Sequence, residues 1–223
     1  MSDAFDWIYL YETMPALLAG LRMTIAVSAL AIVISLLIGA LGAAMRLSGR
    51  AVLSWPARGY VAFMRNTPLL VQLFFIFYGL PAIGLRLSAF WSGVLCLAVW
   101  GGSYHLESFR AGYLGVSRGA REAAQSLALK NWQYALLVAL PIALRTAVPS
   151  MLNTSIAMLK NSSYLQAIGL AEMTFVAIDR ISLEFRTIEL FAAICVLYLV
   201  LVLAMSAAAS RLELRLQRPF TAR

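Results

Sequence analysis

The chain has little charge: only 13% of its 223 residues are Asp, Glu, Lys or Arg, about half the share that soluble domains carry. Hydrophobic residues make up 62% of it. A soluble fold of this size has too little interior to bury so much apolar surface. The composition therefore excludes a disordered chain, a disulfide-rich scaffold and an ordinary cytosolic enzyme, and it indicates a protein with several membrane spans.

Residues for redox, metal or acid–base chemistry are also scarce. Cys96 and Cys195 lie in apolar stretches without metal-ligand spacing, so we interpret both as small buried hydrophobic residues. His105 is the only histidine, and we expect it to be packed in the interior. With Ser103 and Glu107 it forms the only cluster that could serve an enzyme. We therefore expect no catalytic site, no metal site and no cofactor held by this chain.

Two sequence signals that would change the interpretation are missing. No Gly-x4-Gly-Lys-Ser/Thr loop is present, so the chain has no motif for cradling nucleotide phosphates, and the energy for any work must come from elsewhere. The first 21 residues contain Asp3, Asp6 and Glu12 but neither lysine nor arginine, whereas a cleaved secretion signal has a basic start.

What the sequence does contain is a set of long uncharged runs. A helix needs about 20 apolar residues to cross the hydrocarbon core of a bilayer. Four uncharged runs reach this length, and a fifth is interrupted only by Lys160. They predict an all-α polytopic membrane protein, a single domain over residues 1–223. Its five spans are expected at about 20–45, 60–80, 87–107, 146–170 and 189–210.

The run Asn131–Leu144 is shorter, contains Pro141, and is better explained as an interfacial segment than as a sixth span. With five spans and the N-terminus outside, 13 of the 18 Lys and Arg residues lie on the cytoplasmic side. A sixth span would move the basic C-terminal tail outside and weaken this bias. We therefore predict five spans, an external N-terminus and a cytoplasmic C-terminus.

Small residues predict close packing between the helices. Ser35, Gly39 and Ala43 repeat every four residues along one face of the first span. Residues of this size at this spacing allow helix backbones to approach closely in lipid. We expect this face to contact another helix.

The cytoplasmic loop 110–145 is too long and too rich in helix-forming residues to be a passive linker. We expect two short helices, joined by a turn near Ala128–Asn131, that lie along the membrane surface. Packed helical contacts are stiff, so a protrusion of this kind is suited to docking a soluble partner.

This loop resembles the coupling loop of permease subunits of bacterial ATP-binding-cassette importers, known as the EAA motif. The family pattern is Glu-Ala-Ala, three residues, Gly, nine residues, Ile, any residue, Leu-Pro. The matching residues here are Glu122, Ala123, Ala124, Leu140 and Pro141. Ala128 stands where the family has Gly, and Val138 replaces Ile. Because alanine tolerates a positive φ poorly, we expect the turn at Ala128 to be helical rather than left-handed.

Three further stretches resemble the permeases for polar amino acids within this family: 63–81, 107–112 and 159–172. The resemblance covers roughly Leu17 to Arg211. It implies the type I importer permease fold, with a coupling-helix loop, in the bacterial inner membrane. It also implies two cytoplasmic ATPase subunits that bind ATP, a second permease subunit (a copy or a homologue), and an external solute-binding protein. The opening Phe5-Asp6-Trp7 is similar to permeases for acidic amino acids.

Polar residues at membrane depth are candidates for the solute path or its gate. They are Thr67, Gln72, Lys160, Asn161, Ser162 and Ser163. An ionisable residue inside a span usually faces a cavity or a partner, and a buried ammonium would suit a carboxylate. The alternative is that Lys160 snorkels, or pairs with an acid such as Glu107.

Two other polar features favour structural interpretations. The stretch Arg65–Pro68 is either a hinge or the anchored start of a helix with Arg65 at the headgroups, and we favour the anchored start. Glu107 and Arg110 are three residues apart, so they are expected to form a structural pair on one helix face.

Two alternative functions were weighed against a transport subunit. A stand-alone secondary transporter or channel for small polar solutes would be expected to show an internal repeat, and none is visible; five spans also do not divide into equal halves. A membrane-embedded enzyme would need a richer site than Ser103, His105 and Glu107.

Overall fold

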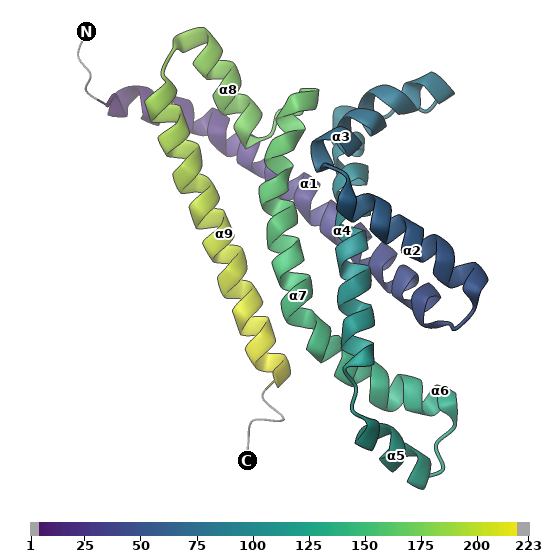
Figure 1. Cartoon of the computed structure of the whole chain (residues 1–223). Helices are drawn as coiled ribbons and strands as arrows, with labels where there is room; N and C mark the ends of the chain where they lie inside the picture. The colour runs from purple at the N-terminus through teal and green to yellow at the C-terminus, as the bar shows by residue number, and fades with distance from the viewer. Residues whose placement is uncertain (1–4, 218–223) are drawn as a thin grey trace. The chain divides into compact units, whose positions relative to one another are not determined.

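The computed structural model describes residues 5–217 of the chain, and these residues are helical apart from short connections (Figure 1). In chain order the helices are α1 (Trp7–Leu47), α2 (Ala51–Asn66), α3 (Leu69–Phe74), the π-helical η1 (Phe75–Gly79), the 3₁₀ helix η2 (Leu80–Ile83), α4 (Ala89–Leu114), α5 (Arg118–Ser126), α6 (Asn131–Gln133), the π-helical η3 (Tyr134–Ala139), α7 (Leu140–Asn161), the 3₁₀ helix η4 (Ser162–Ile168), α8 (Met173–Glu184) and α9 (Thr187–Gln217). No strand occurs within 5–217, which confirms the all-α prediction.

The contacts within the chain form two compact units, and the boundary between them falls inside α1, α4, α7 and α9. The first unit comprises α1 up to Val33, Thr67–Ala98 and Ile156–Met205. The second comprises Ile34–Asn66, Val99–Ser155 and, among the described residues, 206–217.

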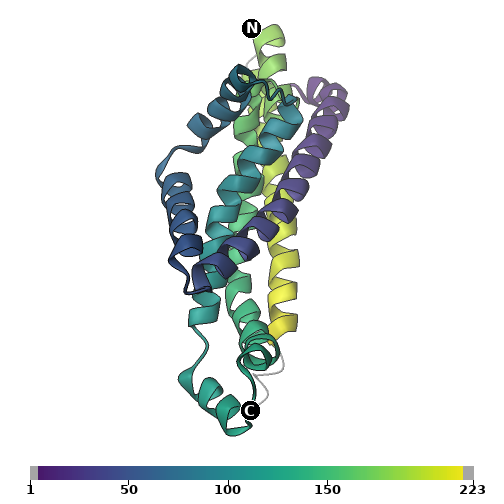
Figure 2. The same ribbon diagram turned by 90° about the vertical axis from the view of Figure 1, so that its right-hand side faces the viewer.

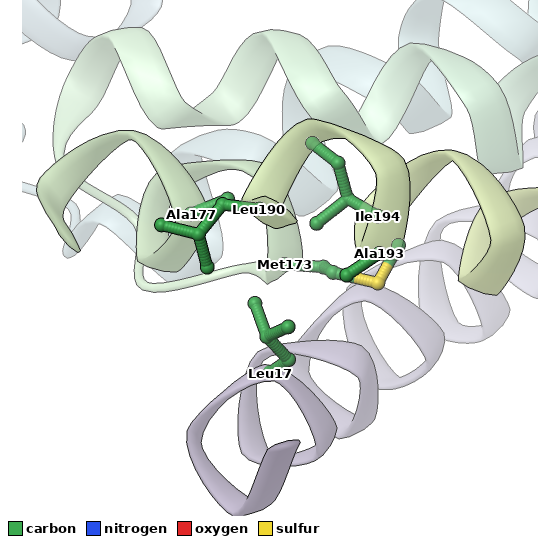
Figure 3. Close-up of a cluster of buried hydrophobic side chains, with 6 residues drawn as sticks. All are labelled: Leu17, Met173, Ala177, Leu190, Ala193 and Ile194. Carbon is green, nitrogen blue, oxygen red and sulfur yellow. The ribbon is translucent and has the colours of Figure 1, made fainter. Parts of the chain in front are cut away.

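The core of the first unit joins α1, α8 and α9 (Figure 3). Its buried side chains are Leu17, Met173, Ala177, Leu190, Ala193 and Ile194. Gly20 lies against the start of α8, where an added Cβ would be 2.8 Å from the Cα of Met173. Only glycine fits at this distance, so Gly20 sets how closely α8 approaches α1.

In the second unit α1 packs against α4 along the small-residue face that the sequence predicted. Ser35 Oγ lies 3.0 Å from His105 Nδ1, and a Cβ on Gly39 would be 2.5 Å from the His105 Cβ. Ala43 belongs to the buried cluster with Ala57 and Leu106. The prediction that this face contacts another helix is therefore confirmed.

Within residues 5–217, three helical segments are long and apolar enough to cross a membrane: Trp7–Leu47, Asn131–Ile168 and Thr187–Arg215. A fourth exists if the bent pair Ala51–Asn66 and Leu69–Ile83 counts as one. The predicted span at 87–107 begins two residues before α4, which has 26 residues, and lies otherwise within it. This stretch contains Gly101, Gly102, Ser103 and His105 and so is less apolar. The count of five spans stays a prediction.

The helix expected over 60–80 is broken. α2 starts earlier, at Ala51, and ends at Asn66, and α3 starts at Leu69. Pro68 between them is extended, with φ −63° and ψ 135°. Proline lacks an N–H and disfavours helical geometry in the residue before it, which explains why the helix stops here.

Candidate functional site

The segment predicted to dock a partner forms a short helical hairpin in the second unit. α5 starts at Arg118 behind Ser117, whose Oγ accepts a hydrogen bond from the Ala120 N–H at 3.3 Å. α5 lies beside η3 (Figures 1 and 2). Glu122 and Ala123 are exposed, whereas Ala124 is buried. The structure thus leaves the side chains of the first two residues of the Glu-Ala-Ala motif exposed and packs the third in the interior.

The turn after α5 is left-handed, so the expectation of a helical turn at Ala128 was wrong. Ala128 has φ +53°. The Leu129 N–H donates to the Ala124 carbonyl at 3.0 Å, and the Ala128 N–H donates to the Gln125 carbonyl at 2.9 Å. These two bonds satisfy carbonyls at the end of α5, and they require a left-handed residue at the turn. The family pattern has glycine at this position, and glycine is the residue that most readily adopts a left-handed conformation after a helix. The family pattern therefore indicated this turn, although this chain has alanine there.

The hairpin continues into α7 without a loop. The Lys130 N–H donates to the Gln133 side chain at 2.8 Å at the start of α6, and η3 leads directly into Leu140 and Pro141. Leu136, Leu137 and Leu140 are exposed. The two motif residues Leu140 and Pro141 therefore begin the long helix, and an apolar surface precedes them.

Glu107 and Arg110 form the ion pair that their spacing predicts. Arg110 Nη2 lies 2.6 Å from Glu107 Oε2, and Arg46 Nη2 lies 3.8 Å from Glu107 Oε1. The hydrogen bonds that Arg110 donates to the Glu107 carboxylate raise the pKa of Arg110 above its ordinary value. Glu107 thus already pairs with two arginines. We therefore no longer favour the alternative in which Glu107 pairs with Lys160.

Lys160 lies in the last turn of α7. A cation at this end of a helix interacts favourably with the helix dipole. Ser162 and Ser163, in η4, donate their hydroxyls to the carbonyls of Leu159 (2.7 Å) and Lys160 (2.9 Å). The predicted turn of polar residues is thus a change from α- to 3₁₀-helix just after Asn161.

A cavity of about 360 Å³ in the first unit opens beside this turn. It is lined by Lys160, Ser163, Cys195, Tyr198, Leu199 and Val202. Cys195 is exposed, which corrects the expectation that both cysteines are buried; Cys96 is indeed buried. A helix as uniformly apolar as α9 does not reveal in its sequence which face packs inward.

The other two predicted path residues are brought together at the start of α3. Gln72 Nε2 donates to Thr67 Oγ1 at 2.7 Å and to the Thr67 carbonyl at 3.1 Å. Gln72 is buried. These two hydrogen bonds span the break at Pro68 and fix the backbone just before α3.

The last residue of the stretch 159–172 is a buried acid to which the sequence analysis gave no role. Glu172 is fully buried at the start of α8, and its carboxylate accepts from the N–H groups of Thr174 (3.0 Å) and Phe175 (2.8 Å). The Tyr198 hydroxyl on α9 lies 3.1 Å away. Burial raises the pKa of Glu172 above its ordinary value, and the two N–H groups act against this. An acid directly before a helix was the sequence signal for this capping role.

His105 is packed, as predicted. It is fully buried, and its Nε2 lies 3.2 Å from the Met151 carbonyl. Because a carbonyl only accepts, Nε2 carries the proton and Nδ1 accepts from the Ser35 hydroxyl. His105 therefore joins α1, α4 and α7 within the second unit.

Comparison with known proteins identifies what these elements resemble. The model of the family "binding-protein-dependent transport system inner membrane component" matches residues 35–218. The glutamine transport system permease protein GlnP of Escherichia coli K12 is 34% identical over 215 residues, which is 96% of this chain and 98% of GlnP. The octopine transport system permease protein OccM of Rhizobium meliloti is also 34% identical, over 87% of this chain and 83% of OccM.

Solved structures agree with the sequence relatives. An amino acid ABC transporter crystallised with histidines superposes with a TM-score of 0.90 at 34% identity, over 95% of this chain and 99% of that chain. The MetNI methionine ABC transporter, in an inward-facing conformation, gives a TM-score of 0.70 at 20% identity, over 97% and 99% of the two chains. The second likeness concerns the fold alone.

Proposed function

Since the chain belongs to the family of binding-protein-dependent transport system inner membrane components, we propose that it forms, as one domain, the membrane pathway through which polar amino acids enter the cell. Glutamine is the solute named for the relatives that are 34% identical over 96% of the chain. This match over nearly the whole chain is the observation that carries the proposal. The octopine permease points to the same class, an amino acid derivative.

The energy comes from partner subunits. Two cytoplasmic ATPase subunits bind and hydrolyse ATP, and this chain neither holds a cofactor nor performs catalysis. A second permease subunit completes the pathway, and an external solute-binding protein delivers the amino acid. The N-terminus lies outside and the C-terminus in the cytoplasm of the bacterium.

The hairpin α5–α6 is the contact for the ATPase subunits in this proposal. Its exposed residues Glu122 and Ala123 and the turn at Ala128 form the docking surface. Movement of the hairpin passes into α7 through η3, because no loop interrupts the backbone between Asn131 and Asn161. α7 carries Lys160 near its far end, where we place the solute path or gate together with Asn161, Ser162, Ser163, Thr67 and Gln72.

The test is uptake of radiolabelled L-glutamine by proteoliposomes that contain the chain, its ATPase subunits and its binding protein, with ATP inside. Uptake is expected only when all components and ATP are present. Uptake at the same rate without the ATPase subunits would contradict the proposal and favour a stand-alone carrier.

Lys160 is tested in the same assay. Lys160→Ala is expected to lower uptake at least fivefold at unchanged membrane abundance, whereas Lys160→Arg keeps the cation and retains most of the uptake. Normal uptake by Lys160→Ala would leave this residue with only its role at the end of the α7 helix dipole.

A further inference from the structure

The second unit contains an apolar groove where α1 and α4 end and η3 leads into α7. Its volume is about 280 Å³. Among its lining residues only Tyr113 carries a polar side chain, and none is charged. Ala43 and Ala143 are buried at its floor, whereas Leu136 and Leu140 on its wall are exposed. The groove is therefore an indentation of the surface that a flexible apolar chain could enter from outside.

Short side chains give the groove its depth. Five of its lining residues are alanines, and three of these lie on α1. On η3 and α7 the lining residues Leu136, Leu140 and Leu144 are spaced four residues apart, so they share one helix face. An apolar cavity stays free of water, and the hydrocarbon of the bilayer is the solvent next to it. Lipid chains are therefore the natural occupants of this groove.

One end of the groove borders the connections between the helices. Leu47 is the last residue of α1, and Ala135 is the second residue of η3. Arg50 stands three residues after Leu47, and a chain advances at most about 3.6 Å per residue, so the two backbones lie within about 11 Å. The Lys130 carbonyl accepts from the Tyr134 N–H at 2.9 Å, which places Lys130 about one helical turn before Ala135. Both cationic side chains are exposed near this end of the groove.

The connections at this end are positively charged. The segments 48–50 and 115–130 contain four cations and one acid, a net charge of 4 − 1 = +3. The cations are Arg50, Arg118, Arg121 and Lys130, and the acid is Glu122. None of the four cations forms an ion pair with another residue in the described part of the chain. Their N–H groups are therefore available to phosphate oxygens, which bind such donors strongly.

We propose that this groove binds one acyl chain of an anionic phospholipid, whose phosphate is held by Arg50 and Lys130. The long apolar stems of these residues lie along hydrocarbon while their charged ends stay at the level of the headgroups. Basic sites between membrane helices on the cytoplasmic side are suited to anionic headgroups. With an external N-terminus, the lipid comes from the cytoplasmic leaflet. Its acyl chain lies against η3, the segment that connects the α5–α6 hairpin to α7.

The experiment measures photo-cross-linking in the purified permease–ATPase complex in phosphatidylcholine nanodiscs. The probes are phosphatidylglycerol and phosphatidylcholine with the same diazirine group in one acyl chain. The phosphatidylglycerol probe is expected to label residues 40–47 and 135–144 at least fivefold more than the other probe, and unlabelled phosphatidylglycerol should displace it. Equal labelling by both probes would indicate ordinary boundary lipid and overturn the proposal. Labelling that appears only when the ATPase subunits are removed would indicate a protein in the groove and also overturn it.

A large side chain in the groove tests the site of the acyl chain. Ala44 is an exposed lining residue, so Ala44→Trp is expected to fill the groove and to lower labelling of 135–144 by the phosphatidylglycerol probe at least fivefold. Leu37→Trp places the same ring on the exposed surface of α1 outside the groove and should be labelled like the parent. Basal ATP hydrolysis by each complex reports correct assembly. Unchanged labelling of the assembled Ala44→Trp complex would overturn the proposal.

Charge variants test the site of the headgroup. Arg50→Gln and Lys130→Gln are each expected to raise the phosphatidylglycerol concentration that halves labelling by about fivefold, the effect of one basic side chain at an anionic membrane surface. The double variant should lose the preference for phosphatidylglycerol. Arg211→Gln combined with Arg215→Gln removes the same charge from the exposed surface of α9 and should keep it. Arg50 lies outside the α5–α6 hairpin, so an assembled Arg50→Gln complex with parental competition would overturn the proposal.

Discussion

Ala128 and Phe185 are the two non-glycine residues with a positive φ within the described part of the chain. For an L-residue this conformation brings Cβ close to the following carbonyl and costs roughly 1–2 kcal/mol. At Ala128 the strain is offset by two hydrogen bonds that end α5. The turn of the α5–α6 hairpin therefore carries strain at Ala128 that a glycine at this position would not have.

Ala128→Gly is accordingly expected to slow hydrogen exchange at the Leu129 amide, since relief of strain stabilises the turn by about 1 kcal/mol, and to leave uptake intact. Ala123→Gly is the matched control. The same chemical change inside α5 should destabilise that helix by about 1 kcal/mol and speed exchange. Loss of coupling in Ala128→Gly would show that the alignment of the loop with the family pattern is wrong.

Glu172 gives stability a pH dependence of known sign. Its pKa is raised in the folded state, so the folded chain holds this proton more tightly than the unfolded chain, where Glu titrates near 4.3. The stabilisation is complete below the unfolded pKa and is lost as pH rises through the folded one.

Glutamine does not titrate, so Glu172→Gln should remove the part of the free energy of unfolding that depends on the protonation of Glu172. The difference in melting temperature between Glu172→Gln and the parent is therefore expected to shift in favour of the variant as pH rises from about 4 through the raised pKa. Thermal unfolding in detergent across this pH range measures it. A difference that stays constant with pH would contradict the assignment.

At the scale of helices, α4 and α7 meet at a contact that excludes any side chain at Gly112. A Cβ there would lie 2.4 Å from the Ala143 carbonyl oxygen. Since backbone cannot move aside as a flexible side chain does, Gly112→Ala should destabilise the second unit by about 1–3 kcal/mol. Gly119→Ala, in α5, meets no atom within 4 Å and should stabilise its helix by up to about 1 kcal/mol. Thermal unfolding of both variants tests the pair.

α5 is expected to carry the contact with the ATPase. Glu122→Lys reverses an exposed charge on this helix, so we expect it to abolish capture of the ATPase subunits by affinity-tagged permease without reducing membrane insertion. Glu12→Lys makes the same change on the exposed surface of α1 and should capture them normally. Normal transport by Glu122→Lys would remove α5 from the docking surface.

The sequence predicted helices well and their interruptions poorly. Uncharged runs located α1, α7 and α9 because membrane helices must satisfy every backbone group internally. The break at Pro68 falls where the sequence left a hinge or an anchored helix start open, but the predicted span over 60–80 runs across it because no charged residue follows Arg65 until Arg86. Lys160 was expected inside a span, and the sequence did not show that α7 ends one residue after it. The sequence also did not show that Ser108, Ser150 and Thr154 line one cavity, because they come together only when α4 packs against α7. No local pattern reports that.

For the whole molecule the predicted orientation can be measured directly. Ile8→Cys and Leu127→Cys, each in a Cys195→Ala background, place one exposed thiol on α1 and one after α5. A membrane-impermeant maleimide added to intact spheroplasts is expected to label Ile8→Cys, while Leu127→Cys should react only in inside-out vesicles. Labelling in the reverse pattern would contradict an external N-terminus.

The loop-free passage from α6 through η3 into α7 also constrains how this chain can change in length. Every residue inserted into a continuous helix rotates what precedes it by about 100° about the axis. A single residue inserted between Gln133 and Leu140 would therefore turn α5 to another side of the α7 axis. An insertion of three or four residues would complete nearly a full turn and return α5 to about its original direction. The π-helical η3 already accommodates one surplus residue per turn just before Pro141. Insertions and deletions in related sequences should therefore occur mainly at Gly115–Ser117 and be nearly absent from 131–140.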